Sequence, residues 1–278
     1  MQNLSNLFIA EELPKALQNR ISAHSRHSNF NLHHWLKGRF PLKPGDTILD
    51  LGCGNGNYTD LFWNQIAPQG SILGIDKNQA LIEEAQKRHT TKGNKIGFLV
   101  GDFDHPMPIP ADLQKRGFDS IFSIYSLYYV DDAKRIVDEI YRYLAPKGHF
   151  VLIGPGPKNG LDLMKLNAMW TQKGPNKKIL GHINRINDAF LPLFHKIFGE
   201  KQVSFDCIDN VMTFPSPHDF IDYYWATLLW RESIEDMEEK AVAKIKVETV
   251  EWAKANVPIT IGKQILCLTG RKDDANNG

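Results

Sequence analysis

Short apolar runs alternate with amphipathic stretches between residues 47 and 153, and this alternation predicts strands and helices in turn. Strands are predicted at residues 47–51, 71–75, 96–100, 118–124 and 149–153. Helices are predicted between them at residues 57–66, 78–89 and 133–144. Because apolar strands joined by helices are typical of a parallel sheet that is covered on both faces, the pattern indicates a doubly wound α/β fold.

The segments on either side of this region have different patterns. Residues 1–40 read as helical and are followed by the turn-rich stretch 41–46. Residues 158–200 read as helices and loops, with breaks expected at Gly174-Pro175 and at Gly181. Further on, strands are predicted at residues 202–208 and 263–269, and helices at residues 217–229 and 233–255.

These patterns predict a single domain rather than two. Its expected parts are a helical cap (1–40), a ligand-binding core (41–157), sheet completion with helical insertions (158–260), and a last strand with a tail (261–278). The last strand is expected to return to the sheet, which is why a separate second domain is not predicted.

Composition and charge narrow the functional classes. The chain has 278 residues, of which 42% are hydrophobic and 23% charged, an ordinary globular mixture. Its net charge of +1 lacks the basic excess of a nucleic-acid-binding protein, so no nucleic-acid partner is expected. The most apolar stretch, residues 121–130, is far shorter than the ~20 residues that a membrane helix needs, and the N-terminus lacks the features of a secretory signal.

The cysteines and histidines predict neither disulfides nor a metal site. Cys53, Cys207 and Cys267 are too far apart for a disulfide framework or a CxxC site, and they favour a reducing, cytoplasmic setting. Four histidines between residues 24 and 34 have no acidic or cysteine cluster beside them, so packing or solvated roles are favoured over metal ligation.

A glycine-rich segment carries the most informative chemistry. A predicted buried strand runs into Gly52-x-Gly54-x-Gly56 and then into a helix, so a ligand can approach the main chain and the unpaired N–H groups of the helix start. Asp76 ends the next strand, where a carboxylate can accept hydrogen bonds from ribose hydroxyls. The dinucleotide fingerprint is GxGxxG, whereas the spacing here is GxGxG. Asp50 would repel a pyrophosphate and favour a ligand that carries an ammonium or sulfonium group.

Together with four further segments, this motif resembles the class I S-adenosylmethionine-dependent methyltransferases. The resemblance covers residues 35–155, through ILDLGCGNG at 48–56, GIDKN at 74–78, GDFDHPMP at 101–108, FDSIFSIYSLYYVDD at 118–132 and LAPKGHFVLIGPGP at 144–157. It implies a Rossmann-like, mostly parallel seven-stranded sheet with an antiparallel last strand, and S-adenosyl-L-methionine as cofactor. It also implies that the N-terminal helices and residues 155–260 form a lid over that cofactor.

The resemblance implies roles for the matching positions around the glycine loop. Asp50 and the loop Gly52–Gly56, with Gly54 between them, would hold the methionine end of the cofactor. Asp76 would bind the ribose hydroxyls, with Lys77 packed beside it.

Positions further along the chain are assigned in the same way. Asp102 would bind the adenine amino group, and Phe103 would flank the ring. Ser123 would offer its backbone carbonyl to the amine or line the methyl-donor pocket. Tyr125 and Tyr128 would face the methyl acceptor. Many relatives have histidine where Tyr128 and Tyr129 stand, so no catalytic residue is assigned here.

Simpler structural roles stay open for most of these residues. The glycines can serve only the turn, Asp76 can cap a helix, and Asp102 can form a local turn bond. The aromatics of the predicted lid, among them Trp170, can pack around an acceptor or form the lid's own core.

The predicted function is methyl transfer from S-adenosylmethionine to a small molecule. The alternatives are an RNA or protein methyltransferase and a non-catalytic S-adenosylmethionine-binding regulator. The stretch SIYSLYY after the fourth strand lacks the Asn/Asp-Pro-Pro-aromatic signature of base-amine methylation. No metal is expected, and the oligomeric state is left open.

Overall fold

The structure is a computed structural model that describes residues 4–174 and 177–274. Residues 1–3 of the predicted cap, residues 275–278 of the predicted tail and the predicted break at Pro175 lie outside the described residues.

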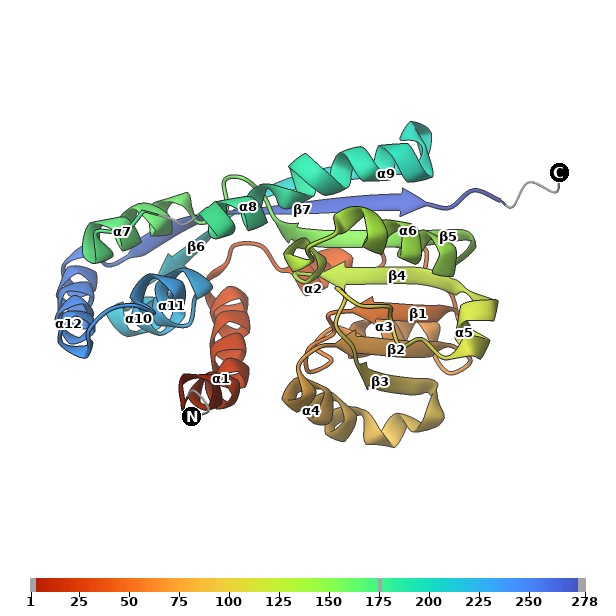
Figure 1. Ribbon diagram of the computed structural model, residues 1–278, viewed down its shortest axis with the longest axis horizontal. Coiled ribbons are helices and arrows are strands. Elements are labelled where there is room, and N and C mark those ends of the chain that lie inside the picture. Colours follow the sequence, from red (N-terminus) through yellow and green to blue (C-terminus); the bar gives the residue numbers. More distant parts are fainter. Residues whose placement is uncertain (1–3, 175–176, 275–278) are drawn as a thin grey trace. The chain divides into compact units, whose positions relative to one another are not determined.

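The strands form one seven-stranded sheet in the order β3-β2-β1-β4-β5-β7-β6 (Figure 1). The strands are β1 (Thr47–Leu51), β2 (Ser71–Asp76), β3 (Ile96–Val100), β4 (Phe118–Ile124), β5 (Leu144–Pro155), β6 (Val203–Phe214) and β7 (Ile259–Arg271). The first five strands pair in parallel, and β7 runs antiparallel to β5. The predicted doubly wound fold and its antiparallel last strand are therefore confirmed.

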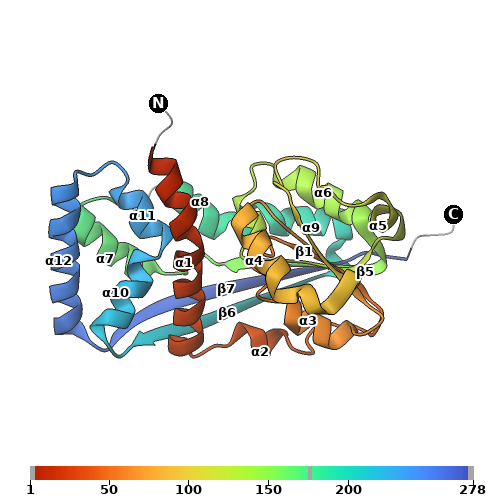
Figure 2. The ribbon, with the colours of Figure 1, turned by 90° about the horizontal axis from the view of Figure 1, so that it is seen from below.

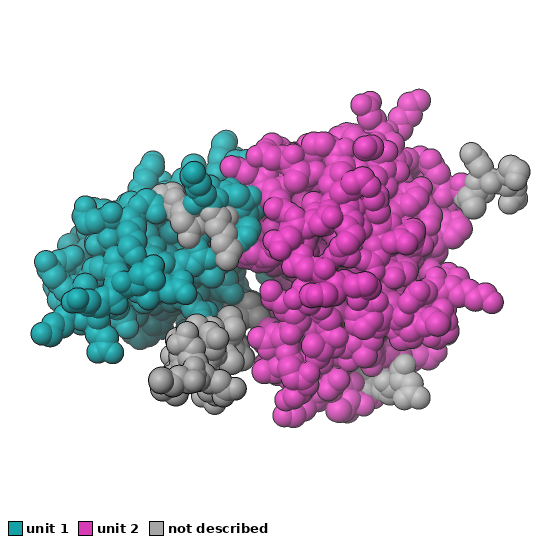
Figure 3. Space-filling view, viewed as in Figure 1, with its two compact units in different colours: residues 1–31, 157–183, 208–264 teal, residues 32–156, 184–207, 265–278 magenta. Residues whose placement is uncertain are grey.

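The chain divides into two compact units, which Figure 3 shows in different colours. Unit 1 comprises residues 1–31, 157–183 and 208–264, and unit 2 comprises residues 32–156, 184–207 and 265–278. Both β6 and β7 begin in one unit and end in the other. The prediction of a single domain stays a prediction.

Unit 2 is a sheet with helices on both faces. Its helices are α2 (Leu32–Leu36), α3 (Thr59–Ile66), α4 (Gln79–His89), α5 (Ala111–Arg116), α6 (Ala133–Tyr143) and α9 (Leu191–Phe198). Figure 2 shows α3 on one side of the sheet and α6 and α9 on the other. The core on the α6 side is built around fully buried Phe118, Ile121 and Phe150. The three predicted helices of this region are found within two residues of their predicted bounds, whereas α5 was not predicted.

Unit 1 contains α1 (Leu4–His27), α7 (Leu161–Thr171), α10 (Pro217–Trp225), α11 (Leu228–Ile234), α12 (Glu239–Asn256) and most of α8 (Lys177–Arg185). Three predictions were wrong here. Gly181 lies inside α8 instead of breaking it. The helix predicted to run to residue 229 ends at Trp225, because the Thr227 hydroxyl caps a new helix by accepting from the Trp230 N–H at 3.2 Å. The last long helix begins at Glu239, six residues later than predicted.

The aromatic residues of the predicted lid belong to two separate cores. Trp170 and Tyr224 are buried with Phe220 in unit 1, and the ring centres of Trp170 and Tyr224 are 5.2 Å apart. Phe194 packs in unit 2, with its ring centre 5.0 Å from that of Phe150. The aromatics of unit 1 therefore form that unit's own core, the alternative left open by the sequence.

Among the described residues, every helix is too short or too polar to cross a membrane.

Candidate functional site

The glycine loop joins the buried strand β1 to α3 in a backbone conformation that needs glycine. The φ angles of Gly52, Gly54 and Gly56 are +77°, +54° and +74°, all in the left-handed region. A Cβ atom placed on Gly52 would lie 2.0 Å from the Ser126 Oγ, so the loop also passes closely beneath the end of β4. The turn thus requires glycine at all three positions because of their positive φ angles. At Gly52 the nearby Ser126 side chain also leaves no room for a Cβ atom.

Asp76 ties this loop to the carboxyl end of β2. Its Oδ2 accepts a hydrogen bond from the Gly54 N–H at 2.9 Å, and its Oδ1 accepts one from the Asn78 N–H at 2.9 Å. The Gly52 N–H donates to the carbonyl of Ile75 at 2.7 Å. Asp76 therefore fixes the main chain of the glycine loop, and its role toward the ribose hydroxyls stays a prediction.

Asp50 is the most unusual group at this end of the sheet. Its side chain is only 2% exposed, and its Oδ2 has no hydrogen-bond partner among the described residues. Burial, and then the charge of Asp76, raises the pKa of Asp50 to about 7. A buried carboxyl without a partner is costly, and a cationic group of a ligand would relieve that cost. The residues here fit a ligand that carries an ammonium group.

Asp102 and Phe103 follow β3 and lie beside the same region. The Gly101 N–H donates to the carbonyl of Asp76 at 3.0 Å, which places Asp102 next to Asp76 along the strand ends. The Asp102 Oδ1 accepts from the Asp104 N–H at 3.1 Å, the local turn bond that the sequence left open. Phe103 is buried in the core of unit 2, so its side chain has a packing role. The ligand roles of both residues stay predictions.

Two residues that the sequence reasoning missed hold this loop in place. Arg135 on α6 donates to the carbonyl of Phe103 and forms a 2.8 Å ion pair with Glu139. The Glu139 Oε1 in turn accepts from the Met107 N–H at 3.1 Å. Their i,i+4 spacing on a predicted helix was the signal that could have found them.

The residues after β4 combine burial with strain. Ser123 is fully buried, and its Oγ accepts from the Leu127 N–H at 3.1 Å. Tyr125 is 37% exposed and has a φ of +57°, which is rare for a residue with a side chain. Tyr128 is 5% exposed, and its hydroxyl donates to the Tyr129 hydroxyl at 3.2 Å. Residues with strained backbone cluster at functional sites, and of these three residues Tyr125 is the one with a positive φ. Their acceptor roles stay predictions.

Lys77, immediately after Asp76, is exposed, and its predicted packing beside Asp76 stays a prediction.

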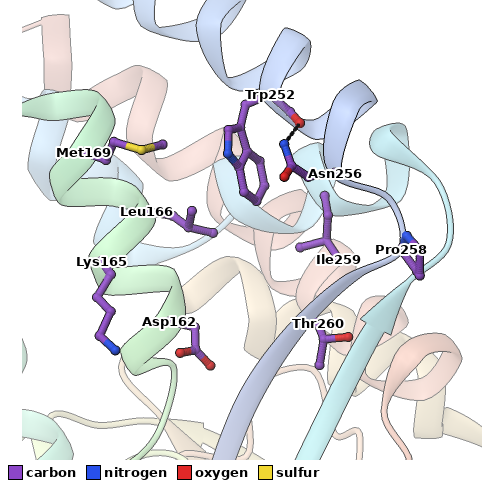
Figure 4. Close-up of a pocket in the computed structure, with 9 residues that line it drawn as sticks. All are labelled: Asp162, Lys165, Leu166, Met169, Trp252, Asn256, Pro258, Ile259 and Thr260. Atoms are coloured by element: carbon purple, nitrogen blue, oxygen red, sulfur yellow. Dashed lines mark hydrogen bonds between the residues drawn. The ribbon is translucent and has the colours of Figure 1, made fainter.

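A cavity of about 410 Å³ in unit 1 is a different place from this site (Figure 4). It opens between α7 and the end of α12, with Met169, Leu166 and Trp252 on its walls and Asp162 and Lys165 toward one end. None of the residues predicted to bind cofactor or acceptor lines it.

Comparison with known proteins identifies the family. A family model described as a methyltransferase domain matches residues 42–207, which is more than half of the chain. The chain belongs to this methyltransferase family. The match confirms the resemblance to class I S-adenosylmethionine-dependent methyltransferases.

Several methyltransferases are similar in sequence to part of this chain. Demethylmenaquinone methyltransferase of Symbiobacterium thermophilum is 32% identical over 115 residues, which are 40% of this chain and 43% of that protein. Juvenile hormone acid O-methyltransferase of Bombyx mori is 32% identical over 112 residues, 40% of this chain and 38% of that protein. The chain thus spans about two fifths of the length of such relatives.

Solved structures show the same fold at low sequence identity. The YcgJ protein of Bacillus subtilis has a TM-score of 0.54 at 17% identity, with 87% of this chain and 98% of that chain covered. A Geobacter sulfurreducens methyltransferase, solved in complex with S-adenosyl-L-homocysteine, has a TM-score of 0.52 at 17% identity, with 93% and 98% covered. These likenesses agree with the doubly wound sheet.

Proposed function

We propose that this protein is an S-adenosylmethionine-dependent methyltransferase that moves a methyl group to a small-molecule acceptor by in-line displacement. The observation that carries the proposal is the buried, unpartnered Oδ2 of Asp50 beside a glycine loop that Asp76 holds in place. The family match supports the same reaction.

The cofactor roles follow from this arrangement. Asp50 and the loop Gly52–Gly56 receive the ammonium end of the cofactor, because an unpartnered buried acid favours a cation. Asp76 receives the ribose hydroxyls, with Lys77 beside it. Asp102 and Phe103, next along the strand ends, are proposed to bind the adenine, and Ser123 is proposed to offer its backbone carbonyl to the amine or to line the methyl-donor pocket.

The sulfonium of the cofactor supplies an already activated methyl group, so the protein's own work is to orient the acceptor and exclude water. Tyr125 and Tyr128 are proposed to face the acceptor. A proton acceptor is needed only for an acceptor that is protonated at neutral pH, and we assign none.

The named relatives support a small-molecule acceptor. They include methyltransferases of demethylmenaquinone, juvenile hormone acid and trans-aconitate, which are chemically unlike one another. The absence of a basic excess in the composition speaks against a nucleic-acid acceptor. The three free cysteines, two of them buried, support a cytoplasmic location.

Calorimetry on the purified protein tests the cofactor. We expect binding of S-adenosylmethionine and S-adenosylhomocysteine, and no binding of NAD. Asp76→Ala should weaken S-adenosylhomocysteine binding by about 1–3 kcal/mol, the cost of removing one partner from buried polar groups. Asp112→Ala, at an exposed acid in α5 of the same unit, is the matched control and should bind as the wild type does. Unchanged affinity in Asp76→Ala would remove Asp76 from the site.

A methyl-transfer screen tests the acceptor class. The protein is incubated with isotopically labelled cofactor and fractionated cell extract, and products heavier by one methylene are identified by mass spectrometry. Label in the metabolite fraction supports the proposal. Label only in RNA or protein favours a macromolecular acceptor, and cofactor binding without any transfer favours the regulatory alternative.

A further inference from the structure

Tyr58 stands two residues after Gly56 of the glycine loop and directly before α3, and its side chain is half-buried. Burial, and then the charge of Asp50, raises the pKa of Tyr58, so the phenol stays protonated and lies within the electric field of that carboxyl. Among the described residues, none forms a hydrogen bond with the Tyr58 hydroxyl. A hydrogen-bond donor is therefore available near the unpartnered Oδ2 of Asp50.

The ring of Tyr58 is held in place by His33 on α2. The two rings stack with 4.5 Å between their centres and an interplanar angle of 19°. The Asn57 side-chain amide donates to the His33 Nε2 at 3.2 Å, so this nitrogen carries no proton. Burial, and then the charge of Arg88, lowers the pKa of His33, which agrees with a neutral ring. All of these residues belong to unit 2, as Asp50 does.

The groups near Asp50 leave its negative charge for a ligand. Asp76 adds a second negative charge, which helps to raise the pKa of Asp50. Arg88, the cation whose charge reaches His33, pairs with Asp60 at 3.8 Å. Because Tyr58 and a neutral His33 carry no charge, the ammonium of a ligand can pair with Asp50 without displacing either of them.

The methionine end of S-adenosylmethionine carries an ammonium and a carboxylate on the same carbon atom. A site that binds the ammonium at Asp50 must also bind the carboxylate nearby, where the charges of Asp50 and Asp76 repel it. We propose that the Tyr58 hydroxyl donates a hydrogen bond to this carboxylate and that His33 positions the Tyr58 ring for it. The inference rests on the proposed function, because it assigns further residues of the cofactor site. A neutral donor suits this place, since a lysine or arginine would pair with Asp50 and compete with the ammonium of the cofactor.

Calorimetry with two ligands tests the role of Tyr58. S-adenosylhomocysteine carries both the ammonium and the carboxylate, whereas its decarboxylated analogue ends in an aminopropyl group and carries the ammonium alone. The wild type should bind S-adenosylhomocysteine more tightly than the analogue. Tyr58→Phe removes the hydroxyl and keeps the ring that stacks on His33. It should weaken S-adenosylhomocysteine binding about tenfold or more and leave binding of the analogue unchanged, because a hydrogen bond to a charged group is lost.

Three further variants complete the test. Tyr141→Phe is the matched control, because Tyr141 lies on α6 of the same unit with its ring centre 5.2 Å from that of Phe198, and both ligands should bind to it as to the wild type. His33→Ala removes the stacked ring and should weaken binding of S-adenosylhomocysteine but not of the analogue. His33→Phe restores a ring and should recover most of that affinity. A merely structural role of His33 would weaken both ligands alike.

The outcomes separate this inference from the proposed function. Equal affinity of the wild type for the two ligands, unchanged S-adenosylhomocysteine affinity in Tyr58→Phe, or an equal loss for both ligands in that variant would each overturn the role of Tyr58. Wild-type binding by His33→Ala, or no recovery in His33→Phe, would overturn the positioning role of His33. In all these cases S-adenosylhomocysteine still binds to the wild type, so the proposed function stands. If the wild type binds neither ligand, the proposed function is rejected and this inference with it.

Discussion

Asp50 is buried at a cost to stability, and the role proposed for it is to bind the ammonium end of the cofactor. Its carboxyl is buried, and its pKa is raised to about 7 by burial and by the charge of Asp76. The folded protein without ligand therefore favours the protonated form, whereas an ammonium ligand favours the carboxylate. Because this pKa is about 7, the carboxyl of Asp50 changes its protonation state near neutral pH.

Cofactor affinity should consequently depend on pH. As the pH rises through about 7, Asp50 loses its proton and affinity for S-adenosylhomocysteine should increase, then level off. Calorimetry across this range would measure the change. Asp50→Asn should abolish the pH dependence and bind weakly throughout. An affinity that does not change with pH in the wild type would contradict this assignment.

The same substitution should affect folding in the opposite direction. Because the folded-state pKa of Asp50 is raised, its contribution to stability is present at low pH and is lost as the pH rises from the unfolded value toward and above 7. Asp50→Asn should thus stabilise the free protein above pH 7, which urea unfolding on both sides of that pH would measure. No gain in unfolding free energy would show that the site relaxes around the charge.

Gly52 is expected to tolerate no side chain. Gly52→Ala places a Cβ on a residue with φ of +77° and against the Ser126 Oγ at 2.0 Å. We expect a loss of about 1–3 kcal/mol in unfolding free energy from backbone strain, with further loss from the clash. Urea unfolding gives the measurement. Gly97→Ala is the matched control, because its Cβ would meet only Leu73 Cδ1 at 3.8 Å. A wild-type unfolding curve for Gly52→Ala would mean that the loop rearranges freely.

For individual residues, the sequence predicted which ones stand at the strand ends better than it predicted their contacts with distant segments. Asp50, the three glycines and Asp76 were predicted at the ends of two strands, and in the structure these strands, β1 and β2, are adjacent and parallel. The sequence could not reveal that Ser126 covers Gly52 or that Arg135 holds the Phe103 carbonyl, because both contacts join segments far apart in the chain.

Among the elements, apolar runs located strands well and helix ends poorly. The predicted bounds of β3 and β4 are those of the structure, since each is a short apolar run bounded by polar residues or glycine. Helix α5 was missed because it has no buried residue and so leaves no apolar face in the sequence. The break at Ala226 and Thr227 depends on a single threonine hydroxyl, which hydrophobic periodicity does not register.

Three helices of unit 1 meet at a buried polar residue. The Asn167 side chain on α7 donates to the Ser233 Oγ on α11 at 2.9 Å and accepts from the Tyr224 hydroxyl on α10 at 2.8 Å. Since every group in this contact is buried, its bonds specify how α7, α10 and α11 pack.

Asn167→Ala should therefore destabilise the protein by about 1–3 kcal/mol or more, because the Tyr224 hydroxyl loses its acceptor in a buried place. Urea unfolding would measure the difference. Asn256→Ala is the control, since that exposed side chain donates to the carbonyl of Trp252 within its own helix. Equal effects of the two substitutions would show that the buried network adds nothing specific.

For the molecule as a whole, the sequence predicted the architecture of the sheet, whereas the single domain stays a prediction. Residues 47–153 carry a regular strand and helix pattern, and this region became the parallel part of the sheet. The two compact units leave no signal in the sequence, because β6 and β7 each continue from one unit into the other without a linker of distinctive composition.

The closing of the predicted lid is the largest-scale expectation. If residues 158–200, 210–250 and 10–40 close over bound ligands, as the resemblance implies, closure would expel water that competes with the acceptor. Binding of S-adenosylhomocysteine together with the acceptor found in the methyl-transfer screen should then raise protection from hydrogen exchange in all three segments. S-adenosylhomocysteine alone is the control, and it should protect mainly the segments around Gly52–Gly56, Asp76 and Asp102. The aromatics of unit 1 already form a core of their own. Added protection in this unit would therefore indicate that an already folded unit closes over the ligands, and not that the unit folds when they bind. Protection confined to the cofactor segments with both ligands bound would reject the lid and favour an open acceptor site, which suits a macromolecule.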